Sequence, residues 1–329
     1  MTTTTTARSG PTPPRTGTPP AIEAHGLVKH FGSTRAVDGV DLIVPTGSVY
    51  GVLGPNGAGK TTTVSMLATL LRPDAGEARI FGYDVTRDAV AVRSLVGVTG
   101  QYASVDEDLT GRENLVLFSR LLGLSRPAAR RRAEDLLEEF GLTEAADRPL
   151  KEFSGGMRRR LDLAASLIAT PPLLFLDEPT TGLDPRTRAQ MWDTIRRLVA
   201  NGATVLLTTQ YLDEADQLAD RIAVIDHGRV IADGTAAELK QSVGGSTLML
   251  TPADRAEVPR VAEIVGAVLG ERVILSAEAA RVTAPLHRTD LVPDVLIALR
   301  DNNIDITTIT VAQPSLDEVF LAITGDKEA

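Results

Sequence analysis

The sequence has no cysteine among its 329 residues. This absence excludes disulfide bonds, thiol catalysis and metal sites built on thiolate ligands, and it agrees with a cytosolic location. No apolar run approaches the roughly 18 residues that a membrane-spanning helix needs. If the protein works at a membrane, we therefore expect a partner to hold it there.

Positive charge is also scarce, because 34 basic residues face 43 acidic ones and the net charge is -9. This balance implies no broad basic face and argues against nucleic acid as the main partner. The hydrophobic content of 43% is ordinary for a globular protein. A chain of this length suggests roughly two domains with a sizeable core.

One stretch fits the phosphate-binding pattern G-x-x-x-x-G-K-[ST]. Its glycines allow a close backbone approach to phosphate oxygens, and the N–H groups of the loop and of the next helix can converge on them. Lys60 would bring charge to the β- and γ-phosphates, and the Thr61 hydroxyl would reach Mg²⁺. The candidate nucleotide-binding residues are Gly54, Pro55, Asn56, Gly57, Ala58, Gly59, Lys60, Thr61 and Thr62.

The context of this loop also fits. Val49 to Leu53 is typical of a short buried strand, and Lys60 to Leu71 is predicted to be a helix. A chance glycine-rich turn is the alternative, and the pattern should arise by accident in about 1% of chains this long. The sequence therefore predicts a nucleotide site.

A second segment supplies carboxylates. Leu173 to Leu176 is an apolar run typical of a strand buried on both faces. It delivers Asp177 and Glu178 at its carboxyl end, where ligands bind in open α/β sheets. Asp177 would hold Mg²⁺ and Glu178 would orient or deprotonate the attacking water. Two solvated turn carboxylates are the alternative, which the nearby phosphate loop disfavours.

A third segment, Ser154-Gly155-Gly156-Met157, precedes a helix predicted over Arg158 to Ile168. Ser-Gly-Gly at a helix start suits an anion, but the Lys60 loop already cradles the phosphates. A second phosphate-binding helix start implies a nucleotide sandwiched between two chains.

With these segments in order, the chain resembles the nucleotide-binding subunits of ABC transporters over about residues 22 to 240. Ser154, Gly155 and Gly156 match that family's Ser-Gly-Gly-Gln signature, with Met157 replacing the glutamine. The resemblance implies further nucleotide-contacting residues. These are Phe31 as an adenine platform, Gln101 in a glutamine loop that touches Mg²⁺, and Asp184 in the interface loop Thr181-Gly182-Leu183-Asp184.

More closely, the chain is similar to the ATP-binding subunits of daunorubicin-resistance-type drug exporters. The segments that carry this likeness are 98–107, 154–162, 208–216 and Pro314 to Phe320. In that subgroup the last segment is implied to contact a partner, and a purely structural helix is the alternative.

One position departs from most ABC ATPases, because Gln210 stands where they carry a histidine that contacts the γ-phosphate. Glutamine can donate a hydrogen bond there but cannot carry the imidazolium charge. We assign Gln210 and Glu178 as the catalytic residues and predict slow but real hydrolysis.

The predicted fold class is α/β. It comprises an ABC-type P-loop ATPase domain (RecA-like core, antiparallel β subdomain, helical subdomain) and a small C-terminal α+β domain. We expect a disordered tail at 1–20, the ATPase domain at 21–241, with early strands at Ile22 to His25 and Val40 to Val44, and an accessory domain at 242–329. The accessory domain has the order β-α-β-β-α-β, a ferredoxin-like pattern.

The function implied by the resemblance is ATP hydrolysis that powers export of a hydrophobic, anthracycline-like drug. It requires ATP and Mg²⁺, a homodimer and an integral membrane permease, with the chain peripheral on the cytoplasmic face of the membrane. Two alternatives stay open: a soluble ABC ATPase acting on ribosomes or DNA, and a weakly hydrolysing nucleotide sensor. One cassette and an acidic balance disfavour the first, and an intact Glu178 disfavours the second.

Overall fold

The computed structural model of the protein describes residues 19–99, 105–243, 246–271, 273–276, 281–312 and 314–324. The predicted tail at 1–20 lies outside the described residues except for Pro19 and Pro20, and Gln101 lies outside them too. Within the described residues, no helix is both long enough and apolar enough to cross a bilayer.

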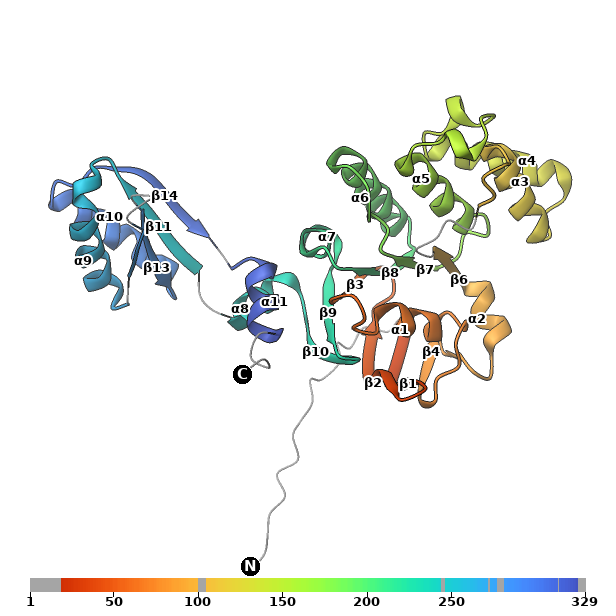
Figure 1. The fold of residues 1–329 in the computed structure, drawn as a ribbon, viewed down its shortest axis with the longest axis horizontal. Helices are drawn as coiled ribbons and strands as arrows, with labels where there is room; N and C mark the ends of the chain where they lie inside the picture. Colours follow the sequence, from red (N-terminus) through yellow and green to blue (C-terminus); the bar gives the residue numbers. More distant parts are fainter. Residues whose placement is uncertain are drawn as a thin grey trace, which may run out of the picture.

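A six-stranded sheet with the order β10-β9-β3-β8-β7-β6 forms the centre of the N-terminal body, residues 19–243 (Figure 1). Its strands are β3 (Val49–Leu53), β6 (Val96–Thr99), β7 (Leu173–Asp177), β8 (Thr204–Thr209), β9 (Arg221–Asp226) and β10 (Arg229–Gly234). All neighbours are parallel except β9 and β10, which form an antiparallel hairpin through His227-Gly228. Every residue of β3, β7 and β8 is buried, which confirms the buried strands predicted at Val49 to Leu53 and Leu173 to Leu176.

An antiparallel sheet, β2-β1-β4-β5, packs beside it. Its strands are β1 (Ile22–Phe31), β2 (Thr34–Val44), β4 (Ala75–Ile80) and β5 (Tyr83–Asp84). The strands predicted at Ile22 to His25 and Val40 to Val44 are too short. Register shifts between Ala24 and Leu27 let the β1–β2 pairing continue across Gly26, whose φ is 58°.

Helix α1 (Lys60–Leu67) leaves the phosphate loop and shares a core with both sheets. It ends before the predicted Leu71, because the backbone at Thr69 takes a left-handed φ of 63°. Next come α2 (Ala89–Leu95), which the pattern did not predict, α3 (Gly111–Leu121), α4 (Arg126–Glu139) and the 3₁₀ turns η1 (Thr143–Ala145) and η2 (Leu150–Glu152).

Helix α5 (Gly155–Ser166) begins three residues before its predicted start at Arg158. The Ser154 side chain accepts a hydrogen bond from the Met157 N–H at 3.3 Å and caps the helix. The cap therefore places both glycines in the first turn. Helices α6 (Pro185–Ala200) and α7 (Leu212–Leu218) follow strands β7 and β8.

The C-terminal part confirms the predicted β-α-β-β-α-β order. Its elements are β11 (Ser246–Pro252), α9 (Val258–Leu269), β12 (Ile274–Ser276), β13 (Arg281–Leu286), α10 (Val292–Asp301) and β14 (Ile306–Ala312), with 3₁₀ turns η3 (Arg255–Glu257) and η4 (Thr289–Leu291). The sheet order is β12-β13-β11-β14 and every pairing is antiparallel. The predicted fold class is therefore confirmed.

The last helix, α11 (Leu316–Thr324), leaves this C-terminal sheet and lies beside α8 (Ala236–Val243), as Figure 1 shows. Leu316 and Val319 are buried in one cluster with Leu53, Ala215 and Leu239. The chain thus returns to the N-terminal body after it has formed the C-terminal sheet and its helices. The division into domains at 241/242 stays a prediction.

Candidate nucleotide-binding site

Strand register brings three predicted segments to one edge of the central sheet. Leu53 pairs with Thr209 between β3 and β8, and Asp177 pairs with Thr208 between β7 and β8. Gly54, Glu178 and Gln210 each follow one of these paired strand ends. The phosphate loop, the carboxylates and the catalytic candidate Gln210 therefore leave neighbouring strands together, at the carboxyl edge where α/β sheets bind ligands.

The phosphate loop is shaped by glycines that no other residue can replace without strain. A Cβ on Gly54 would lie 2.2 Å from the Ile225 carbonyl oxygen, and one on Gly59 would lie 2.4 Å from that of Ala36. Gly57 and Gly59 also have φ values of 82° and 105°. The loop thus packs directly on neighbouring backbone, which leaves its N–H groups and the start of α1 to form an anion cradle.

Lys60 lies at the bottom of this cradle with 5% of its side chain exposed. Its ammonium donates to the carbonyl oxygens of Gly54 at 2.7 Å and Pro55 at 3.0 Å, and it lies 3.8 Å from a Glu178 carboxylate oxygen. Burial lowers the pKa of Lys60, and the charges of Glu178 and Asp177 oppose that shift. A phosphate group would supply the counter-charge that such a buried cation needs.

Hard oxygen ligands converge beside Lys60. The Thr61 hydroxyl donates to Asp177 at 3.0 and 3.2 Å, and the Thr208 hydroxyl also donates to the Asp177 carboxylate. Mg²⁺ prefers one or two protein oxygens together with phosphates and water. Thr61 and Asp177 therefore fit Mg²⁺ in the presence of a nucleotide, where the ion would neutralise phosphate charge.

Glu178 is held in an unusual backbone conformation, with φ at 49°. Its N–H donates to the carbonyl oxygen of Thr208 at 3.1 Å, and the Thr181 hydroxyl donates to its carboxylate at 3.2 Å. The side chain is 7% exposed. Both the backbone and the carboxylate of Glu178 are thus held in place, which suits its predicted role of orienting water.

A second group of candidate residues lies at the starts of α5 and α6. Asp184 caps α6 by accepting from the N–H groups of Arg186 at 3.1 Å and Thr187 at 3.0 Å. The Thr187 hydroxyl donates to the same carboxylate at 2.6 Å, and this bond, followed by the backbone ones, lowers the pKa of Asp184. A Cβ on Gly156 would lie 2.4 Å from the Thr187 methyl group. The two helix starts therefore touch each other, and Ser154, Gly155 and Asp184 are exposed.

The remaining candidates are more scattered. Phe31 ends β1, is 50% exposed, and has the Lys29 ammonium 5.9 Å from its ring centroid. Gln210 is partly buried, and the predicted role of Gln101 lies outside the described residues. The roles given to these residues and to the two helix starts stay predictions.

Sequence reasoning missed three residues that hold the site together, namely Thr181, Thr208 and Arg159. Thr181 and Thr208 lie inside segments from which other residues were assigned to the site. Their hydroxyl groups at these positions were therefore a signal in the sequence. Nothing in the pattern distinguishes Arg159 from its neighbours Arg158 and Arg160.

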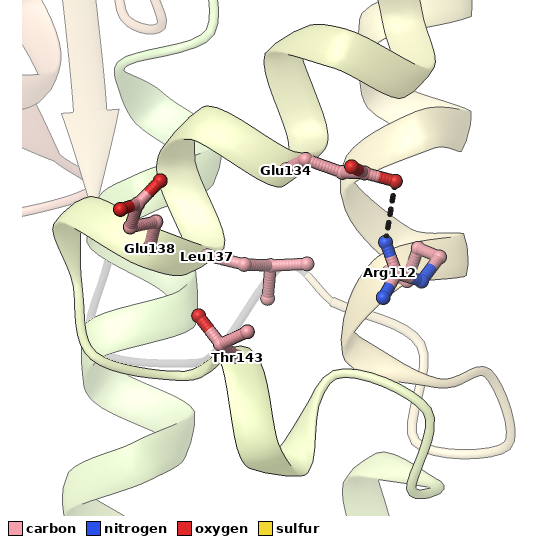
Figure 2. A pocket seen from close by; sticks show the side chains of 5 residues that line it. All are labelled: Arg112, Glu134, Leu137, Glu138 and Thr143. Atoms are coloured by element: carbon pink, nitrogen blue, oxygen red, sulfur yellow. Dashed lines mark hydrogen bonds and ion pairs between the residues drawn. The ribbon is translucent and has the colours of Figure 1, made fainter.

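A separate cavity of about 230 Å³ lies between α3, α4 and η1, lined by Arg112, Glu134, Leu137, Glu138 and Thr143 (Figure 2). Arg112 pairs with Glu134 at 2.9 Å across this cavity and with Asp147 at 2.8 Å. None of the predicted site residues lines it, and the charge of Arg112 is already compensated. The cavity is therefore not the nucleotide site.

A glycine-rich phosphate loop after β3, a carboxylate pair at the end of β7 on the same edge of the sheet and a Ser-Gly-Gly helix start together define an ATP-binding cassette. The chain belongs to the ABC transporter family, whose ATPase domains bind and hydrolyse ATP and whose family model matches residues 37–181.

The chain is 58% identical to the daunorubicin/doxorubicin resistance ATP-binding protein DrrA of Streptomyces peucetius, over 93% of this chain and 92% of that protein. It is 40% identical to the Nod factor export ATP-binding protein I of Ralstonia nicotianae, over 96% and 97% of the two chains. A solved dimeric ATP-binding cassette, MJ0796 bound to ADP and Pi, matches with a TM-score of 0.60 and 25% identity, over 65% of this chain and 98% of that one.

Proposed function

We propose that this chain is the ATP-hydrolysing subunit of an exporter for a hydrophobic, anthracycline-like drug. It acts as a homodimer on the cytoplasmic face of a membrane, bound to a separate integral membrane permease. The observation that carries the hydrolytic part is Glu178, held 3.8 Å from Lys60 beside the Asp177 and Thr61 oxygens. Support for the cargo comes from the drug named in the 58% identical relative.

Each nucleotide is bound by groups from two copies. The phosphate loop, Lys60 and Phe31 of one copy hold the phosphates and the adenine, and Thr61, Asp177 and Gln101 hold Mg²⁺. Glu178 orients or deprotonates the attacking water, and Gln210 donates to the γ-phosphate. The exposed α5 start of the other copy, with Ser154, Gly155 and Gly156, covers the same phosphates, and Asp184 lies at the interface.

ATP acts in this scheme as a ligand that binds the closed dimer more tightly than the open one. Closure pulls on the permease through the segment after Gln101, and hydrolysis reopens the dimer. The two alternative functions are weaker. The acidic balance and the single cassette argue against a ribosome or DNA as the partner, and a sensor has no need of a fixed Glu178.

The test uses the full chain purified with the membrane protein that co-purifies with it. We expect slow phosphate release that falls at least 100-fold in Glu178→Gln, because the water loses its base. Lys60→Ala should weaken ATP binding and restore anthracycline accumulation in cells.

Phosphate release no greater than in Glu178→Gln would contradict the ATPase proposal. If Lys60→Ala abolishes ATP hydrolysis but leaves anthracycline accumulation unchanged, the cargo is a different compound.

A further inference from the structure

We propose that Arg159 is a positioning residue that couples the two ATP sites of the dimer. It joins the start of α5, which faces the nucleotide of the partner, to the backbone that carries Glu178 of its own site. This inference rests on the proposed function, because it requires the head-to-tail dimer.

The guanidinium of Arg159 binds three successive carbonyl oxygens. Nη2 donates to Asp177 at 2.7 Å and to Glu178 at 3.0 Å, and Nε donates to Pro179 at 3.0 Å. The side chain is 14% exposed and lies 3.6 Å from the Asp162 carboxylate. Because the guanidinium is a rigid planar fork, a shift of α5 must move these carbonyls or break the bonds.

Arg159 holds the backbone at Glu178, which is strained. A non-glycine residue with φ at 49° costs about 1–3 kcal/mol and persists only when its surroundings fix it. The N–H of Glu178 is fixed by Thr208, and its carbonyl accepts from Arg159 and from the Thr181 N–H at 3.3 Å. Arg159 is therefore one of the few groups that set the direction of the Glu178 side chain.

The charge of Arg159 is matched by its surroundings. Burial lowers the pKa of Arg159, and the nearby carboxylates of Asp162, Asp177, Glu214 and Glu178 oppose that shift. A guanidinium stays protonated in proteins, so the link does not depend on pH in the working range.

The neighbouring arginines of α5 bind elsewhere, which supplies a matched control. Arg158 donates to the Glu107 carboxylate at 2.7 Å and to the Lys151 carbonyl at 3.1 Å. Arg160 donates to the Phe140 carbonyl at 3.1 Å. Arg158→Gln removes the same charge from the same helix without touching the Asp177 to Pro179 segment.

The experiment uses dimers of two differently tagged full-length copies, assembled with the co-purifying membrane protein. The reference dimer pairs a wild-type copy with a Glu178→Gln copy, so that one site hydrolyses ATP. In the first arrangement Arg159→Gln is placed in the copy that keeps Glu178. In the second it is placed in the Glu178→Gln copy, whose α5 faces the active site.

Coupling predicts that phosphate release falls at least fivefold in both arrangements, while Arg158→Gln stays within twofold in each. The affinity for ATP should stay within threefold, so the loss appears in kcat. Arg159→Lys keeps the charge but loses the planar guanidinium, so it should recover part of the rate of phosphate release. It also replaces Arg159→Gln in the test if that variant folds poorly.

A loss in the first arrangement alone would reduce Arg159 to a local support of Glu178, and a loss in the second alone would reduce it to a support of α5. Either result overturns the coupling. An inactive wild-type dimer would instead contradict the proposed function, independently of Arg159.

Discussion

At the scale of single residues, the site depends on charged groups that the fold removes from water. Lys60, Asp177 and Glu178 are almost fully buried, and each is compensated by an opposite charge or by hydrogen bonds. Glu214, which lies on α7 four residues after Gln210, is also fully buried. Its carboxylate accepts from the Trp192 indole N–H at 3.2 Å.

Burial raises the pKa of Glu214, and the Trp192 hydrogen bond, the neighbouring hydroxyls of Thr209 and Thr180 and the charge of Arg188 only partly oppose this shift. A raised pKa means that the folded state binds this proton more tightly than the unfolded state. The stabilising contribution is complete below the unfolded pKa of about 4.3 and is lost as pH rises through the folded value.

We expect Glu214→Gln to gain stability relative to the wild type as pH rises from 5 to 8. The amide oxygen still accepts from Trp192, and no charge has to be buried. Urea unfolding across this pH range measures the effect, with the exposed Glu139→Gln as a control whose curve should stay parallel to the wild type. A constant difference between Glu214→Gln and the wild type would show that Glu214 does not titrate differently in the two states.

At the scale of elements, the two glycines at the start of α5 have different roles: Gly156 is required for packing, and Gly155 is predicted to contact the nucleotide. Among the described residues, no atom outside the adjoining backbone of α5 lies within 4 Å of a Cβ added at Gly155, whereas a Cβ at Gly156 would meet the Thr187 methyl group. Thr187 cannot easily rotate away, because its hydroxyl is bound to Asp184.

Gly155→Ala should therefore leave the thermal unfolding temperature unchanged or slightly raised, since alanine favours a helix by up to about 1 kcal/mol. Its ATPase rate should fall at least tenfold, because the methyl group would stand between the α5 start and the nucleotide of the partner. Gly156→Ala should instead destabilise the fold by about 1–3 kcal/mol through overpacking. Full activity in Gly155→Ala would place the nucleotide away from this helix.

At the scale of the whole molecule, α11 connects two bodies that have separate cores. The C-terminal domain has its own apolar cluster, including Val261, Val282 and Leu299, and α11 leaves it to pack on α7 and α8. Leu316 is 4% exposed and Val319 is 1% exposed in this contact. The structural alternative for the last segment is therefore favoured within the chain, and its contact with a partner stays a prediction.

Leu316→Ala should lower the free energy of unfolding by about 2–5 kcal/mol, as expected for a truncated buried leucine. The exposed Asp317→Asn, one residue along α11, serves as the control and should change little. Two separate measurements distinguish a structural role of α11 from a role in partner contact: chemical unfolding of the variant, and co-purification of the membrane protein with the folded variant. Loss of the membrane protein without loss of stability would assign α11 to a partner interface instead.

Local patterns determined much of the fold and of the candidate site. Continuous apolar runs predicted β3 and β7, the local pattern predicted the β-α-β-β-α-β order of the C-terminal part, and glycine spacing located the phosphate loop. These features depend on neighbours in the sequence, so a local rule can detect them.

Only the tertiary structure placed Arg159 on three consecutive carbonyl groups, extended β1 across Gly26, and returned α11 to the N-terminal body. Each of these features depends on groups that lie far apart in the sequence. The physical reason is that buried hydrogen-bonding groups and apolar side chains must find partners wherever the packed chain supplies them, and a linear pattern does not record which partner that is.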